Sequence, residues 1–165
     1  MCHPASNFRV RPVTRAASSM YGHTEAVLCL QFSPDCLNLA SGSGDGSLRL
    51  WDINIQTPLK EIKASNWVMA IHWSPDSEKL VFAEKNGNIT SYTLENENEV
   101  SLNGHSKFVT SLAWEPLHLN KECNRVVSAS KDATIRLWNV HTGVCERSFG
   151  THTKCVTKVV WSGRN

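Results

Sequence analysis

Two similar segments constrain the fold of this chain more than any other feature of its sequence. Residues 41–52 read Ser-Gly-Ser-Gly-Asp-Gly-Ser-Leu-Arg-Leu-Trp-Asp, and residues 128–139 read Ser-Ala-Ser-Lys-Asp-Ala-Thr-Ile-Arg-Leu-Trp-Asn. In both segments an Asp follows the first Ser by four positions, a Trp follows the Asp by six, and a Gly-His pair lies upstream. Several residue types that recur at fixed offsets indicate internal repeats, so the chain is built from copies of one structural unit.

The repeat extends beyond these two segments. Four valines that begin an apolar run fall 41, 41 and 47 residues apart, namely Val27, Val68, Val109 and Val156. The last interval is longer because it contains an insertion, residues 115–123. The second unit is degenerate: Phe82 stands in the position of the first Ser, Asn86 in that of Asp, and Tyr92 in that of Trp.

Within each unit, short apolar runs alternate with residues that favour turns. In the first unit the expected strands are residues 26–32, 37–41, 47–51 and 59–62. Ser33-Pro34-Asp35 and Asp45-Gly46 separate these runs, and both sequences are typical of tight turns. A period of 40–45 residues with Gly-His and Trp-Asp marks is the signature of WD40 repeats, each of which forms one blade of a β-propeller. The sequence therefore predicts an all-β fold of about three four-stranded antiparallel blades, followed by the first strand of a fourth.

The spacing of the repeats also predicts where the units begin and end. The expected segments are a disordered N-terminus (1–7), a basic strand or arm leading into the propeller (8–21), a first blade (22–62), a degenerate second blade (63–103), a third blade with the insertion (104–150) and the start of a fourth blade (151–165).

The repeated Ser, His, Asp and Trp resemble the structural tetrad of WD40 propellers. The resemblance implies that the Trp donates to the Ser, the Ser bonds the His, and the His bonds the Asp. The two expected sets are His23, Ser41, Asp45 and Trp51, and His105, Ser128, Asp132 and Trp138. A buried carboxylate and imidazole are stable only when every partner is present.

A second interpretation of the same residues is a catalytic triad of a hydrolase, with Ser41 as the nucleophile. A triad has no reason to recur in successive blades, and no Gly-x-Ser-x-Gly elbow accompanies the Ser. We therefore expect no enzyme activity, no catalytic residue and no cofactor. His152 and Cys155 are close in sequence, but their spacing fits no standard zinc pattern, so no metal site is expected.

The composition favours an intracellular, reduced protein. The chain has 165 residues, a net charge of +2 and six cysteines without a Cys-x-x-Cys pair. It has no signal peptide and no apolar run near 18 residues, which argues against a membrane location.

Two segments are candidates for contact with a partner. Arg9, Arg11 and Arg15 lie in a stretch without acidic residues, which fits either an arm that pairs with a blade edge or a patch that contacts phosphates of RNA. The insertion holds Glu115, Pro116 and His118. Long loops in compact domains are often functional, so the insertion is either a partner contact or a neutral addition.

Three stretches are more specific than a generic WD40 repeat. Residues 9–15, residues 18–27 and the insertion with its flanks (111–123) resemble the Notchless family of ribosome assembly factors. The resemblance implies a nuclear and nucleolar protein of large (60S) ribosomal subunit biogenesis. In that family an eight-bladed propeller docks on the pre-ribosomal particle, and the ATPase midasin holds an N-terminal ubiquitin-like domain and remodels the particle.

This sequence holds no ubiquitin-like domain and fewer repeats than the family, so we expect a fragment or isoform of the propeller that does not contact midasin. Three blades leave two open apolar faces of several hundred Å² each, which predicts either self-association or a partner that covers them. An alternative is a generic WD40 adaptor, for substrate choice by a ubiquitin ligase or for signalling. The insertion and the arginine-rich segment favour the Notchless interpretation.

Overall fold

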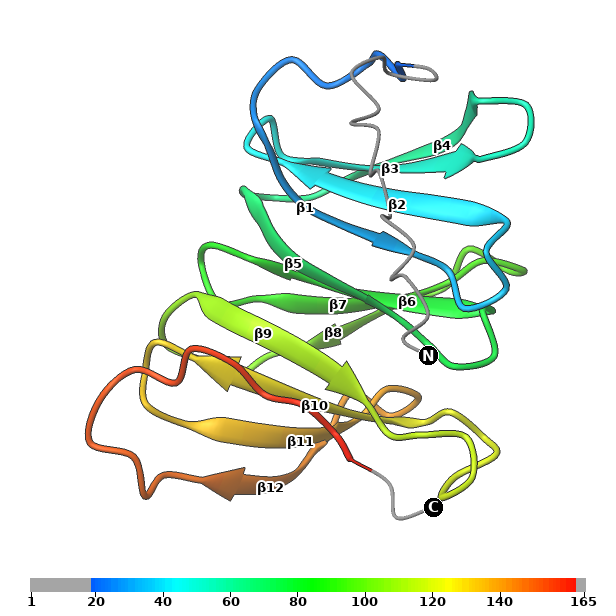
Figure 1. Cartoon of the computed structure of the whole chain (residues 1–165). Helices are drawn as coiled ribbons and strands as arrows, with labels where there is room; N and C mark the ends of the chain where they lie inside the picture. The colour runs from blue at the N-terminus through cyan, green and yellow to red at the C-terminus, as the bar shows by residue number, and fades with distance from the viewer. Residues whose placement is uncertain (1–18, 163–165) are drawn as a thin grey trace, which may run out of the picture.

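The computed structural model describes residues 19–162, and within them every regular element is a β-strand. The twelve strands form three four-stranded antiparallel sheets (Figure 1), which confirms the predicted all-β fold built from propeller blades. The strands are β1 (Val27–Phe32), β2 (Asn38–Ser43), β3 (Ser47–Asp52), β4 (Thr57–Lys63), β5 (Val68–Trp73), β6 (Lys79–Glu84), β7 (Ile89–Thr93), β8 (Glu99–Leu102), β9 (Val109–Trp114), β10 (Arg125–Ser130), β11 (Ile135–Asn139) and β12 (Cys145–Phe149). In this part of the chain, no helix has the length and apolar character needed to cross a bilayer.

Each sheet is a simple meander of consecutive strands. Blade 1 is β1–β4, blade 2 is β5–β8 and blade 3 is β9–β12, with neighbouring strands adjacent in sequence. The turn between the second and third strands of a blade needs a left-handed residue, which is Gly46 (φ 73°) in blade 1, Gly87 (φ 96°) in blade 2 and Ala133 (φ 67°) in blade 3. Glycine adopts this conformation without strain, so the Asp-Gly and Asn-Gly pairs set the hairpins.

The three blades lie face to face, with the first strand of each blade beside the first strand of the next (Figure 1). One core cluster fills the interface between blades 1 and 2, and includes Leu48 and Leu50 on one side and Trp73 and Leu80 on the other. A second cluster fills the interface between blades 2 and 3. Apolar residues on both faces of blade 2 are therefore buried, which explains why its strands read as nearly continuous apolar runs.

The same hydrogen bond joins the first strands of successive blades. The indole Nε1–H of Trp73 donates to the carbonyl of Gln31 at 3.0 Å, and that of Trp114 donates to the carbonyl of His72 at 3.1 Å. Both tryptophans occupy the position that Phe32 occupies in blade 1. This bond fixes how each blade sits on the blade before it.

The outer face of blade 1 carries large exposed apolar side chains. Leu30 and Phe32 of β1 are 61% and 55% exposed, and Leu37 in the following turn is 52% exposed. This outer face of blade 1 is an apolar surface that no described residue covers.

On the other side of the stack, residues 151–162 lie against blade 3 without forming a strand. The hydroxyl of Thr110 donates to the carbonyl of Val156 at 2.6 Å, and that of Ser111 donates to the carbonyl of Val159 at 3.2 Å. The first strand expected for a fourth blade is thus present as an extended segment. It has no ladder because the described residues include no second strand of that blade to pair with.

Candidate functional site

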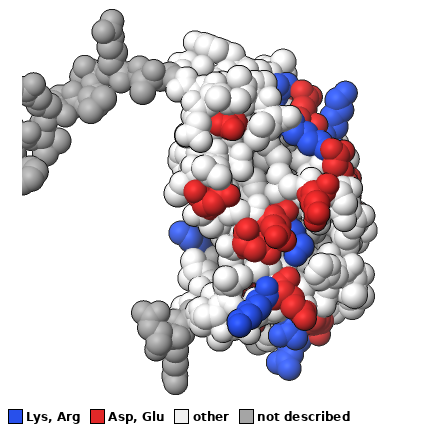
Figure 2. All heavy atoms as spheres, turned by 90° about the vertical axis from the view of Figure 1, so that its right-hand side faces the viewer, with Lys and Arg blue, Asp and Glu red and all other residues white. Residues whose placement is uncertain are grey.

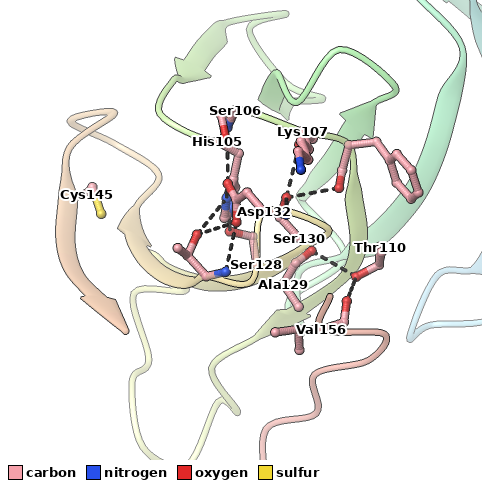
Figure 3. A network of polar contacts seen from close by, with 12 residues as sticks. His105, Ser106, Lys107, Thr110, Ser128, Ala129, Ser130, Asp132, Cys145 and Val156 are labelled. Atoms are coloured by element: carbon pink, nitrogen blue, oxygen red, sulfur yellow. Dashed lines mark hydrogen bonds and ion pairs between the residues drawn. The ribbon is translucent and has the colours of Figure 1, made fainter. Parts of the chain in front are cut away.

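The tetrad of blade 3 lies in the interface between blades 2 and 3 (Figure 3). Trp138 Nε1–H donates to Ser128 Oγ at 2.7 Å, Ser128 Oγ lies 2.7 Å from His105 Nε2, and His105 Nδ1 lies 2.8 Å from Asp132 Oδ2. With the proton on Nδ1 facing the carboxylate, Nε2 accepts the proton of the Ser hydroxyl. Ser128 and Trp138 have no exposed surface, so each of their polar atoms depends on its partner in the tetrad.

The tetrad of blade 1 has the same geometry. Trp51 Nε1–H donates to Ser41 Oγ at 2.8 Å, Ser41 Oγ lies 2.8 Å from His23 Nε2, and His23 Nδ1 lies 3.0 Å from Asp45 Oδ2. The carboxylate also accepts the backbone N–H of Thr24 at 2.9 Å. The tetrad therefore ties the loop before the first strand to the second strand, the third strand and the turn between them.

The glycine that precedes each tetrad His leaves room for an arginine. A Cβ atom on Gly22 would lie 2.5 Å from Nη1 of Arg49, whose side chain lies beside Trp51 and pairs with Glu61 at 2.8 Å. In blade 3 the guanidinium of Arg136 lies 5.9 Å from the ring of Trp138, beside Gly104. The Gly-His pair thus serves the packing of the tetrad and not a separate site.

Burial and hydrogen bonding oppose each other at the tetrad carboxylates. Burial alone would raise the pKa of Asp132, but hydrogen bonds from Thr134, His105 and the backbone of Ser106 together hold its pKa well below the usual range. The pKa of Asp45 is lowered by the equivalent contacts. Burial lowers the pKa of His105, and the neighbouring Asp132 only partly offsets this. The site therefore keeps an ionised carboxylate beside a neutral imidazole.

The order Ser–His–Asp in space matches that of a nucleophilic triad, but its surroundings differ. The hydroxyl oxygen of Ser41 accepts the indole N–H of Trp51, and Ser41 is only 6% exposed. Ser128 is fully buried in the blade interface. A nucleophile must reach a substrate carbonyl and have an oxyanion hole beside it. These hydroxyls are instead committed to holding strands together.

Blade 2 replaces the tetrad with an apolar contact and a different carboxylate. Phe82 and Tyr92 are buried against blade 1. Glu84, two positions after Phe82, is 4% exposed and accepts the hydroxyl of Ser65, the backbone N–H of Ser65 at 3.2 Å and the side-chain amide of Asn86 at 3.0 Å. Glu84 fastens the loop before β5 to the β6–β7 turn, as Asp45 does in blade 1. Sequence reasoning missed this role, although a Glu that ends an otherwise apolar strand was a visible signal.

The insertion folds around its own polar residues. Glu115 is buried and accepts the side-chain amide of Asn120 at 3.0 Å, and Cys123 has no exposed surface. Pro116 is half-buried and His118 is exposed. Of the three candidate contact residues here, His118 is the one that a partner can reach freely. The other candidates, Arg9, Arg11 and Arg15, lie outside the described residues.

The edge of the propeller that carries the insertion is charged. Figure 2 views this edge and shows Asp and Glu side chains interspersed with Lys and Arg along it. The turns on this side contain the exposed acidic residues Asp35, Glu78, Glu95, Glu97 and Glu122. Among residues 19–162, His, Cys, Asp and Glu side chains form no group of three or more that could hold a metal ion.

Comparisons with known proteins agree with this architecture. Residues 15–52 and 96–139 match the family model described as WD domain, G-beta repeat. The chain is 45% identical over 163 residues to Protein Notchless of Drosophila melanogaster, and the aligned region covers 97% of this chain and 33% of that protein. It is 38% identical over 162 residues to Ribosome assembly protein 4 of Saccharomyces cerevisiae, and the aligned region covers 94% of this chain and 32% of that protein.

A solved structure supports the fold. The crystal structure of RRP9 WD40 repeats superposes with a TM-score of 0.77 over 86% of this chain and 43% of that chain, at 21% sequence identity. The chain spans about a third of the length of the curated relatives it matches. The chain contains WD40 repeats, has the β-propeller fold, and is similar in sequence to the Notchless proteins.

Proposed function

We propose that this chain is a non-enzymatic scaffold of ribosome assembly, which acts in the nucleus and nucleolus by docking on precursors of the large ribosomal subunit. Its similarity to Protein Notchless and to Ribosome assembly protein 4 supports the pathway. The tetrads support a non-enzymatic role, since the Ser, His and Asp side chains that could form a triad are hydrogen-bonded to one another and hold the strands of a blade together.

The observation that carries a docking role is the uncovered outer face of blade 1. Leu30 and Phe32 project from β1, which pairs with β2 and accepts the indole bond of Trp73 in blade 2, so the apolar surface is preformed. Exposed apolar patches of a few hundred Å² are typical of protein interfaces. At about 25 cal/mol per Å², covering roughly 400 Å² would contribute about 10 kcal/mol, which is comparable to the stability of a domain.

The occupant of this face is a component of the pre-ribosomal particle, or a second copy of the chain when the particle is absent. The described residues form only propeller blades, so the proposal assigns them docking and not the contact with midasin. A contact of Arg9, Arg11 and Arg15 with rRNA remains part of the proposal as a prediction from sequence.

Affinity purification tests the proposal. The tagged chain, expressed in cells, should recover precursor rRNA and proteins of the large subunit, measured by RNA blotting and mass spectrometry. The variant Leu30→Asp/Phe32→Asp should lose this recovery, whereas Ile55→Asp/Val144→Asp, at two exposed apolar positions in the β3–β4 and β11–β12 turns, serves as the matched control.

Two outcomes would contradict the proposal. Recovery of a cullin-type ubiquitin ligase without ribosomal precursors would favour the generic adaptor. Equal recovery of precursors by the outer-face variant and the wild-type chain would show that docking does not use this face. Light scattering of the purified chain separates self-association from partner binding, because the outer-face variant should be more monomeric than the wild type.

A further inference from the structure

Blades 2 and 3 share a lysine–aromatic pair at the edge opposite to the one that carries the insertion. The backbone N–H of Lys85 donates to the carbonyl of Trp67 at 2.9 Å, and that of Lys131 donates to the carbonyl of Phe108 at 3.0 Å. Nζ of Lys85 lies 3.6 Å from the centre of the Trp67 ring, and Nζ of Lys131 lies 5.2 Å from that of Phe108. The fold therefore places an ammonium group over an aromatic ring at equivalent positions of two neighbouring blades.

Blade 1 has the same backbone contact without these side chains. Its equivalent hydrogen bond joins Gly44 N–H to the carbonyl of Ala26 at 3.0 Å. Neither residue can provide a cation or a ring. The pairs are consequently a property of blades 2 and 3, and are not required for a blade to form.

The two pairs adjoin each other through the β6–β7 turn. A Cβ atom on Gly87 would lie 2.8 Å from the carbonyl oxygen of Lys107, so this turn packs closely on the loop before β9. Lys85, Lys107, Phe108 and Lys131 line a shallow hollow of about 340 Å³. We call these four residues, together with Trp67, the basic edge.

The charge of the basic edge is not balanced within the described residues. Lys85, Lys107 and Lys131 are exposed, and none of them takes part in the ion pairs found between residues 19 and 162. Two acidic groups of the turns in these blades are engaged elsewhere, since Asp132 belongs to the tetrad and the buried Glu84 accepts hydrogen bonds from Ser65.

We propose that the basic edge binds an acidic peptide segment, a run of Asp and Glu residues, from a partner protein. Each ammonium group has donors left for a carboxylate, while the ring beneath it holds the cation in place. Charge complementarity selects the acidic partner.

A peptide fits the basic edge better than single-stranded RNA. A base needs an open aromatic face on which to stack, and the ring of Trp67 has the ammonium of Lys85 over it. The hollow is lined by lysines and contains no arginine, the residue that most often combines phosphate binding with stacking on bases. Binding of RNA is therefore an alternative that the experiment below excludes or establishes.

Fluorescence anisotropy with the full chain tests the inference. The probes are a fluorescein-labelled peptide of eight glutamates and a fluorescein-labelled octauridylate. The variant Lys85→Gln/Lys131→Gln removes the two cations that lie over rings. The variant Lys121→Gln/Lys158→Gln removes two exposed lysines elsewhere and has the same net charge, so it is the matched control.

The peptide should bind the wild-type chain more tightly than the RNA, and its affinity should fall with salt. The first variant should weaken peptide binding about five- to tenfold, and the control less than about twofold. Absence of peptide binding, tighter binding of the RNA, or equal weakening by both variants would each overturn the inference. Trp67→Ala should also weaken binding of the peptide, because it removes the ring beneath Lys85. The circular dichroism spectrum of this variant shows whether the blades remain folded.

Discussion

Removal of a single hydroxyl from the blade 3 tetrad should destabilise the chain strongly. In Ser128→Ala the indole N–H of Trp138 loses its acceptor and Nε2 of His105 loses its donor, each of which lies 2.7 Å from the missing atom. Neither partner can turn to water, since the side chains of Trp138 and His105 are both buried.

The expected loss of unfolding free energy follows from these two contacts. A buried polar group left without its partner costs about 1–3 kcal/mol. Two such groups, with some relaxation, give a loss of about 2–4 kcal/mol, which is a large part of the roughly 5–15 kcal/mol that stabilises a domain. For a chain of this size the loss corresponds to a fall in Tm of roughly 4–16 °C.

Urea unfolding followed by tryptophan fluorescence measures this loss at a fixed protein concentration, because association would change the apparent stability. Ser148→Ala is the control: Ser148 lies exposed on β12 of the same blade, and its loss should change the free energy of unfolding by less than about 0.5 kcal/mol. The double variant Ser128→Ala/Trp138→Phe should cost less than the sum of the single changes by about 1 kcal/mol. If Ser128→Ala were as mild as the control, the assignment of the tetrad as the fastening of the blade would be wrong.

Three further predictions concern groups whose environment the structure defines. The pKa values of Asp132 and His105 are both lowered in the folded chain, so the unfolded chain binds more protons and stability should fall with falling pH, first below about 6.5 and again below about 3.8. Urea midpoints across this range check the sign, and a gain of stability on acidification would contradict it. Glu84→Ala should cost about 1–2 kcal/mol, because it removes the charged acceptor of the hydrogen bonds from Ser65 and Asn86, which are both exposed and can turn to water, and thermal unfolding should show this loss. Burial raises the pKa of Cys29 to about 12, so iodoacetamide should alkylate the exposed Cys155 well before Cys29, as peptide mass spectrometry can determine.

The sequence predicted the fold class because the repeat marks are local. Asp45-Gly46 and Asn86-Gly87 specify hairpins without reference to the rest of the chain. The spacing of the valines then specifies how many hairpins there are. Even the degenerate second unit folds as a blade, since its strand pattern survives the loss of its tetrad.

The role of Glu84 could not be predicted in the same way. Asn86 stands at the repeat position of Asp45, but Ser65 and Glu84 match no member of the tetrad, and the proximity of Ser65 to Asn86 depends on the β5–β6 register. The inward position of Glu115 was missed for a similar reason, because a loop that folds around its own side chains has no sequence period. The basic edge was likewise not predicted, since Trp67 and Lys85 are 18 positions apart and are brought together by a backbone hydrogen bond.

The indole bonds of Trp73 and Trp114 give the stack a direction. Blades 2 and 3 are each hydrogen-bonded to the preceding blade, and the donor is the indole N–H of their own tryptophan. Phe32 holds the equivalent position in blade 1 and has no N–H to donate. Any neighbour that packs on the outer face of blade 1 therefore contacts Phe32 by apolar contact alone. Such an interface can open without breaking a hydrogen bond at this position, whereas the interfaces between blades 1 and 2 and between blades 2 and 3 cannot.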